Sequence, residues 1–71
     1  MDSKYQKFKT LAEKRVNNTI KNIQLIGNLA NTSNYEYTEE DVRKIFKTIK
    51  DEINASESKF RAKNKNKGFK L

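Results

Sequence analysis

Residues 27–42 read Gly-Asn-Leu-Ala-Asn-Thr-Ser-Asn-Tyr-Glu-Tyr-Thr-Glu-Glu-Asp-Val, and they join two segments that have helical periodicity. The second half of this stretch has the features of a helix start. The Thr38 hydroxyl can accept a hydrogen bond from a backbone N–H that the first turn leaves unpaired. Asp41, three residues on, can accept from the Thr38 N–H, as in an aspartate variant of the capping box. The pair predicts a helix that begins at Glu39.

Two further features agree with this helix start. Tyr37 and Val42 have the spacing of a hydrophobic staple. The acidic residues 39–41 place negative charge at the positive end of the helix dipole. Upstream, the polar run Asn-Thr-Ser-Asn at residues 31–34 is typical of turns. We therefore expect a loop over about residues 30–38.

The segment before the loop, about residues 4–29, is predicted to be the first helix. Its apolar residues recur at three- and four-residue steps, as one face of a helix requires. These residues are Tyr5, Phe8, Leu11, Ala12, Val16, Ile20, Ile23 and Ile26. Gly27 leaves two alternatives: a left-handed C-cap, or a point of close approach within a helix that runs on to Ala30. We favour a helix that continues to about residue 29.

The second helix is predicted over about residues 39–62. Its apolar face has the spacing of a heptad repeat, in steps of four and three residues. We call this face the seam; it consists of Val42, Phe46, Ile49, Ile53, Ser56 and Phe60. Ser56 interrupts the seam and weakens its distal end. Residues 63–71 have no apolar periodicity and are predicted to form a basic, disordered tail.

Two helices joined by a short loop favour an antiparallel helical hairpin. One hairpin leaves part of each apolar stripe exposed, and a chain of 71 residues without Cys has no disulfide to stabilise it. We therefore expect an all-α fold in which two hairpins form a homodimeric four-helix bundle. The predicted oligomer interface comprises Val16, Ile20, Ile23, Val42, Phe46, Ile49 and Ile53.

The composition argues against several classes of protein. The chain contains neither Cys nor His, which argues against a zinc site and against thiol or imidazole catalysis. It has no Gly-rich phosphate loop and too little mass to enclose a pocket of about 300 Å³. We expect no enzymatic activity and no cofactor. No apolar run approaches the roughly 18 residues of a membrane span, and no signal-peptide core is present, so cytoplasmic residence without membrane binding is expected.

The net charge of +7 is unevenly distributed along the chain. Residues 1–30 carry six basic and two acidic side chains, residues 31–60 carry five and seven, and residues 61–71 carry five and none. In a hairpin, the first and last of these segments share one pole, which could bind the phosphate backbone of a nucleic acid. The candidate residues for this contact are Arg61, Lys63, Lys65, Lys67 and Lys70. The alternative is that these lysines form only a solvated end of the chain.

The loop offers a second candidate site. Asn34, Tyr35 and Tyr37 could form a tip that binds a protein partner, because aromatic residues anchor interfaces. The alternative is that Tyr37 staples the second helix and Tyr35 covers the end of the seam. The function predicted from the sequence is a small non-enzymatic binding or regulatory module that acts through protein–protein interaction as an oligomer. Association with nucleic acid through the basic pole is the alternative.

Several short motifs resemble a pattern in small helical-hairpin proteins of bacteria and their mobile elements, including phages. The residues that carry the resemblance are Arg15-Val16-Asn17, Ile26-Gly27-Asn28-Leu29, Asn31, Ser33-Asn34-Tyr35, Tyr37-Thr38 and Val42 to Phe46. The resemblance covers roughly residues 11–60 and excludes the basic end. It implies a helical hairpin and a bacterial or phage context. It implies no activity and no site residue.

Overall fold

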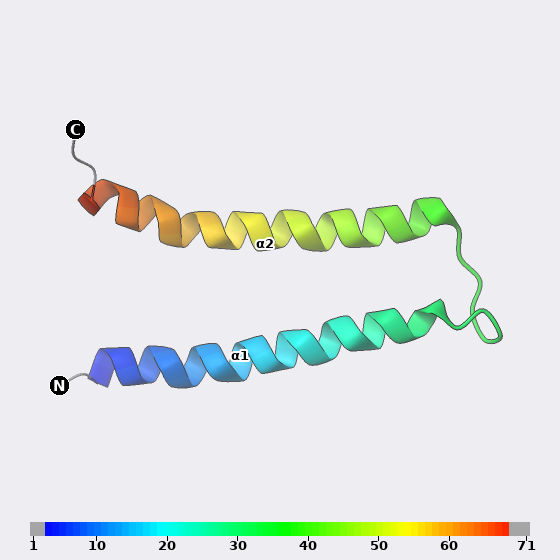
Figure 1. Cartoon of the computed structure of the whole chain (residues 1–71), viewed down its shortest axis with the longest axis horizontal. Helices are drawn as coiled ribbons and strands as arrows, with labels where there is room; N and C mark the ends of the chain where they lie inside the picture. The colour runs from blue at the N-terminus through cyan, green and yellow to red at the C-terminus, as the bar shows by residue number, and fades with distance from the viewer. Residues whose placement is uncertain (1–2, 69–71) are drawn as a thin grey trace. The chain divides into compact units, whose positions relative to one another are not determined.

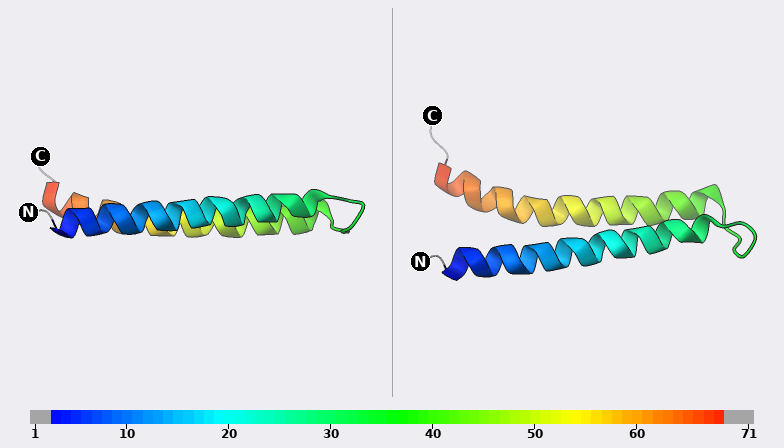
Figure 2. Two further views of the ribbon diagram at one scale, coloured as in Figure 1. Left: turned by 90° about the horizontal axis from the view of Figure 1, so that it is seen from below. Right: turned by 60° about the horizontal axis from the view of Figure 1, so that its bottom comes forward.

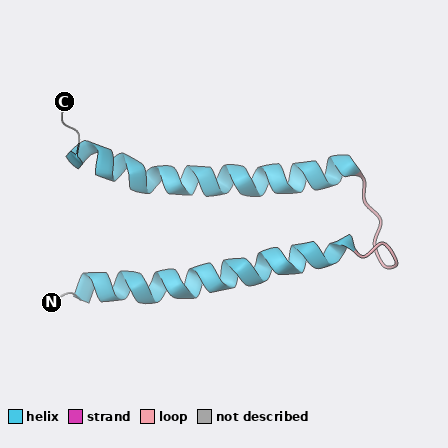
Figure 3. Ribbon diagram, in the orientation of Figure 1, coloured by secondary structure: helices cyan, strands magenta, loops and turns pink. Residues whose placement is uncertain are grey.

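The computed structural model describes residues 3–68, and the side chains of residues 3–62. This part of the chain contains helices and a connecting loop but no strand (Figure 3). The elements, labelled in Figure 1, are the α-helix α1 (Ser3–Gly27), the 3₁₀ turn η1 (Asn28–Ala30) and the α-helix α2 (Glu39–Gly68). The predicted all-helical class is confirmed.

Helix α1 passes directly into the 3₁₀ turn η1 at Gly27. Gly27 has φ −61° and ψ −30°, which is right-handed helical backbone. A Cβ at this position would meet no atom of the described chain within 4 Å. Gly27 is therefore not a left-handed cap, and no described residue of this chain approaches it closely. The helical backbone ends at Ala30, in agreement with the predicted end near residue 29.

The loop after η1 is organised by Asn31. Its side-chain Oδ1 accepts a hydrogen bond from the Ser33 N–H at 2.9 Å. Its backbone carbonyl accepts from the N–H groups of Asn34 at 3.2 Å and Tyr35 at 3.0 Å. Asn31 itself has φ −68° and ψ 101°, an extended conformation that ends the helical backbone. An asparagine whose side chain accepts a hydrogen bond from the backbone N–H two residues later forms an Asx-turn, which is common in loops.

Helix α2 begins as predicted, at Glu39 after the Thr38 cap. The Thr38 N–H donates to Asp41 Oδ2 at 2.9 Å, and the Asp41 N–H donates to Thr38 Oγ1 at 3.0 Å. The Val42 N–H donates to the Thr38 carbonyl at 3.2 Å, which starts the backbone hydrogen bonds of the helix. The capping box therefore satisfies two backbone donors that a bare helix end would leave unpaired.

The end of α2 lies later than predicted. The helix continues to Gly68, six residues beyond the predicted end at residue 62, so the segment predicted as a tail is helical up to Gly68. The reason is that this segment contains no Pro, and its alternating lysines are good helix formers. The rest of the predicted tail, including Lys70, lies outside the described residues.

No residue whose side chain is described is buried. The half-buried residues are Ala12, Ile26, Val42, Phe46 and Ile49, and every other described side chain is exposed. The chain comprises two units, residues 1–36 with α1 and residues 37–71 with α2. Figure 2 shows that each helix runs without a break along its length. Each unit is thus one amphipathic helix with its terminal turns, and the side chains described in residues 3–62 form no core.

Candidate interaction surfaces

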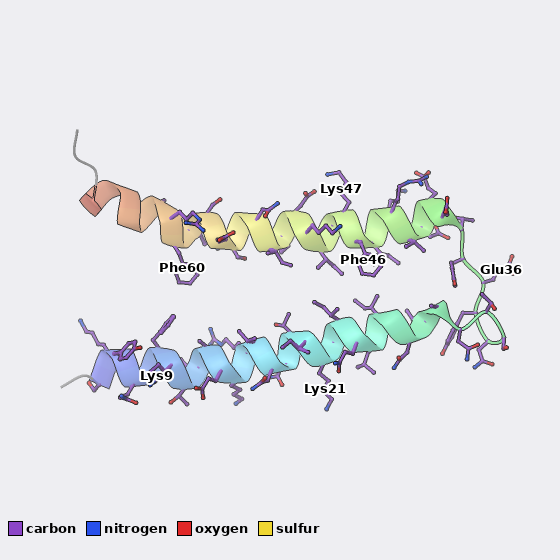
Figure 4. The ribbon with its side chains drawn as sticks, in the orientation of Figure 1. Lys9, Lys21, Glu36, Phe46, Lys47 and Phe60 are labelled. Atoms are coloured by element: carbon purple, nitrogen blue, oxygen red, sulfur yellow. The ribbon has the colours of Figure 1, made fainter. Side chains whose placement is uncertain are left out.

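The seam of α2 is the first candidate surface. Figure 4 shows Phe46 and Phe60 on one side of the helix and Lys47 on the opposite side. Near the cap, Val42, Phe46 and Ile49 are half-buried. Further along, Ile53 exposes 52% and Phe60 exposes 61% of its surface. The four predicted interface residues of this helix therefore share a face whose distal half is open to solvent.

A second apolar face runs along α1. The predicted interface residues Val16, Ile20 and Ile23 lie on it and are exposed. Tyr5 and Phe8 extend the face toward the start of the helix. Thr19 lies within this face, and its hydroxyl donates to the Arg15 carbonyl at 2.8 Å. Because this hydroxyl has a partner inside its own helix, it adds no unsatisfied polar group if the face is covered.

The three predicted loop residues fall on both sides of the boundary between the units. Asn34 and Tyr35 belong to the turn that the Asn31 carbonyl holds together. Tyr37 directly precedes the Thr38 cap of α2. Both tyrosine side chains are exposed. These residues have the accessibility that a contact with a partner requires.

Charge is distributed differently over the two helices. Helix α1 carries six basic residues and one acidic residue, Glu13, and none of the six forms an ion pair within the described part of the chain. The Lys9 ammonium lies 5.4 Å from the centre of the Tyr5 ring, a cation–π contact. Lys7, Lys14 and Lys21 are seven residues apart and fall opposite the apolar face. They form a row of charges about 10 Å apart along the helix axis.

Helix α2 differs from α1 in that several of its charged side chains form ion pairs between neighbouring turns. Arg43 lies 3.8 Å from Glu39 and 3.5 Å from Glu40, and Lys47 lies 2.8 Å from Asp51. Over residues 39–62 the helix has six basic and six acidic side chains. The described ion pairs thus all belong to α2, whereas α1 has an excess of basic side chains without an ion pair in the described part of the chain.

The residues predicted to contact nucleic acid are only partly described. Arg61 donates to Glu57 Oε2 at 2.7 Å, so its guanidinium has a carboxylate partner within the helix. Lys63, Lys65 and Lys67 lie on the helical backbone of α2. Lys70 lies outside the described residues. The predicted basic pole also includes the start of the chain, and its Lys7 and Lys14 lie on α1 in one row with Lys21.

Two ionisable groups have pKa values displaced by these contacts. The hydrogen bond from the Thr38 backbone N–H, reinforced by the Thr38 hydroxyl, lowers the pKa of Asp41. The hydrogen bond to Asp51 raises the pKa of Lys47. Both groups stabilise α2 locally, and neither lies on an apolar face.

Comparison with known proteins identifies no family model, no curated protein and no solved structure that matches the chain. Among the described residues, no helix combines the length and apolarity needed to cross a membrane. The same residues hold no group of three or more acidic, His or Cys side chains placed to bind a metal ion. The amphipathic faces and the charges beside them are thus the features from which a function can be argued.

Proposed function

We propose that this chain is a small, non-enzymatic binding module that functions as a homo-oligomer, with its apolar helix faces as the interface. The observation that supports the proposal is the absence of any buried residue among the described side chains. Thirteen large apolar side chains there expose between 37% and 61% of their surface. Isolated helices are marginally stable in water, and helices in proteins are stabilised mainly by packing of an apolar face. A second copy provides that packing.

The architecture that we propose is an antiparallel hairpin of α1 and α2, two of which form a four-helix bundle. Each large apolar side chain that becomes buried contributes about 1.5–3 kcal/mol. The proposed interface residues are Val16, Ile20, Ile23, Val42, Phe46, Ile49 and Ile53. Their burial across two copies opposes both the cost of association and the cost of ordering the helices. Folding and association are then one process.

The experiment that tests this proposal measures mass and helicity together. Sedimentation equilibrium and circular dichroism over a hundredfold range of concentration should show a dimer that dissociates and loses helicity on dilution. Ile53→Asp should shift both transitions to much higher concentration, because it buries a charge in the interface. Thr48→Asp is the matched control, since it adds the same charge on the polar side of α2 and should leave both transitions in place. A stable helical monomer whose behaviour is independent of concentration would contradict the proposal.

A second candidate function is supported by the charge on α1. The Lys7, Lys14 and Lys21 row lies opposite the apolar face, so it stays accessible when that face is covered. Basic side chains without intrachain carboxylate partners can neutralise phosphates and release counterions from a nucleic acid. In this alternative, the oligomer presents one such row on each copy and binds the phosphate backbone without reading its sequence.

A further inference from the structure

The seam of α2 is bordered by charged residues in an ordered pattern. With Phe46, Ile53 and Phe60 at heptad position a, Lys50 and Glu57 fall at position e. On the other flank, Glu52 and Lys59 fall at position g. Each flank thus has one Lys and one Glu seven residues apart, and the order of the two charges is reversed between the flanks.

Most of these flanking charges have no ion-pair partner in the described chain. The ion pairs of α2 join Glu39 and Glu40 to Arg43, Lys47 to Asp51, and Glu57 to Arg61. They include none of Lys50, Glu52 and Lys59. The flanking charges also border the part of the seam that is most open, where Ile53 exposes 52% and Phe60 exposes 61%. An exposed apolar strip with charges on both flanks has the composition of a coiled-coil interface.

We propose that the segment from Ile49 to Phe60, which we call the distal seam, packs antiparallel against the distal seam of a second copy. The two-fold axis passes close to Asn54 and Ala55. This inference rests on the proposed self-association and adds its partner, direction and register. In an antiparallel pair, position e of one helix faces position e of the other, and position g faces position g. Lys50 of each copy therefore faces Glu57 of the other. On the opposite flank, Glu52 of each copy faces Lys59 of the other.

The apolar residues agree with this register. Ile49 packs against Phe60 of the second copy, and Ile53 packs against Ser56. Ser56, which interrupts the seam within one chain, thus lies beside the axis opposite a larger side chain. The half-buried residues Val42 and Phe46 lie beyond the contact between the two distal seams.

The parallel arrangement conflicts with the same charges. In a parallel pair, position g faces position e of the next heptad of the other chain. Glu52 would then face Glu57 twice in each dimer, and the two Ser56 residues would occupy the same layer. The charge pattern therefore favours the antiparallel direction. Because a pattern that complements itself across a two-fold axis is what an isologous interface requires, it also favours a second copy over a different protein.

The test uses two charge-reversal variants, Glu52→Lys and Lys59→Glu. Each variant alone places like charges opposite each other twice per dimer, and its self-association should weaken by about tenfold or more at low salt. A one-to-one mixture of the two variants should regain the affinity of the natural chain, because Lys then faces Glu on both sides. The double variant Glu52→Lys/Lys59→Glu should also regain it. Lys44→Glu is the control, since it reverses a charge on the polar side of α2 and should leave self-association unchanged.

The possible results separate this inference from the proposed function. If Glu52→Lys strengthens self-association, the helices are parallel, since Lys would then face Glu57, and the antiparallel register is overturned. If neither reversal changes the affinity, the distal seam does not face a second copy, and the inference fails while self-association stands. If the natural chain is a monomer at every concentration, the proposed function itself fails. Weakening by each variant and rescue by mixing support the inference.

Discussion

Thr38 and Asp41 cap each other at the start of α2, with the Thr38 N–H 2.9 Å from Asp41 Oδ2 and the Asp41 N–H 3.0 Å from Thr38 Oγ1. Both bonds join residues three apart in the sequence. They form as soon as the first turn forms and need no contact with another helix. The start of α2 is therefore fixed locally, whereas the stability of the helix depends on what covers its seam.

The first prediction concerns the cap. Thr38→Ala should lower the free energy of unfolding by about 1 kcal/mol, because it leaves one first-turn N–H without its side-chain acceptor. Thr38→Ser, which keeps the hydroxyl, should lie close to the natural chain. Urea denaturation followed by circular dichroism at one fixed chain concentration measures both. Equal stability of the alanine variant and the natural chain would show that the cap is not formed in solution.

The second prediction follows from the lowered pKa of Asp41. A carboxylate whose pKa is lower in the folded than in the unfolded chain contributes stability above the unfolded value and loses it as pH falls through the folded value. The contribution of Asp41 should therefore be constant near neutrality and disappear below about pH 4. Asp41→Asn has no titrating group at this position. Its melting temperature should be lower than that of the natural chain at pH 7, and the difference should vanish at low pH.

The third prediction concerns Gly27. Its right-handed backbone suits any L-residue, and a Cβ there meets no atom of the described chain within 4 Å. Gly27→Ala should therefore raise the free energy of unfolding by about 1 kcal/mol through helix propensity alone. Denaturation and sedimentation of the variant check this together. A loss of self-association would instead reveal that a second chain lies against this position.

The fourth prediction separates the two candidate contacts with nucleic acid. Replacing Lys7, Lys14 and Lys21 together by Gln should weaken binding of a mixed-sequence duplex and reduce the slope of log affinity against log salt by about 2–3. Truncation after Ala62 removes Lys63, Lys65, Lys67 and Lys70 and tests the other end of the chain. Fluorescence anisotropy at several salt concentrations measures both variants. A slope that changes only on truncation assigns the contact to the end of α2 instead of α1.

Much of the fold could be predicted from local sequence signals. The Thr38 cap and the four–three spacing from Val42 to Phe60 are properties of neighbouring residues. The spacing predicted a helix here, and the cap predicted its start at Glu39 correctly. The end of α2 could not be predicted as well, because the alternating Lys and Asn residues after Ala62 have the composition of a disordered tail. Lysine nevertheless favours helix, and nothing breaks the backbone before Gly68.

The interaction surfaces were predictable only in part. Apolar periodicity identified the faces that carry Val16 and Ile53, because a face follows from spacing along one helix. The role of Gly27 could not be decided from the sequence, because glycine permits unusual backbone but does not require it. Lys50 and Glu52 were not singled out, since the importance of a flanking charge depends on the chain that faces it. That information lies in the pairing of helices and not in either helix.

The absence of any buried residue among the described side chains has a consequence for the degradation and abundance of the protein in a cell. If the helices are stable only when a second copy covers them, the folded fraction depends on how many copies are made. Below the dissociation constant, newly made chains remain open to proteases and are removed. Above it, they protect one another and persist. The abundance of the protein then has a threshold, and a modest change in its synthesis becomes a large change in the amount that survives.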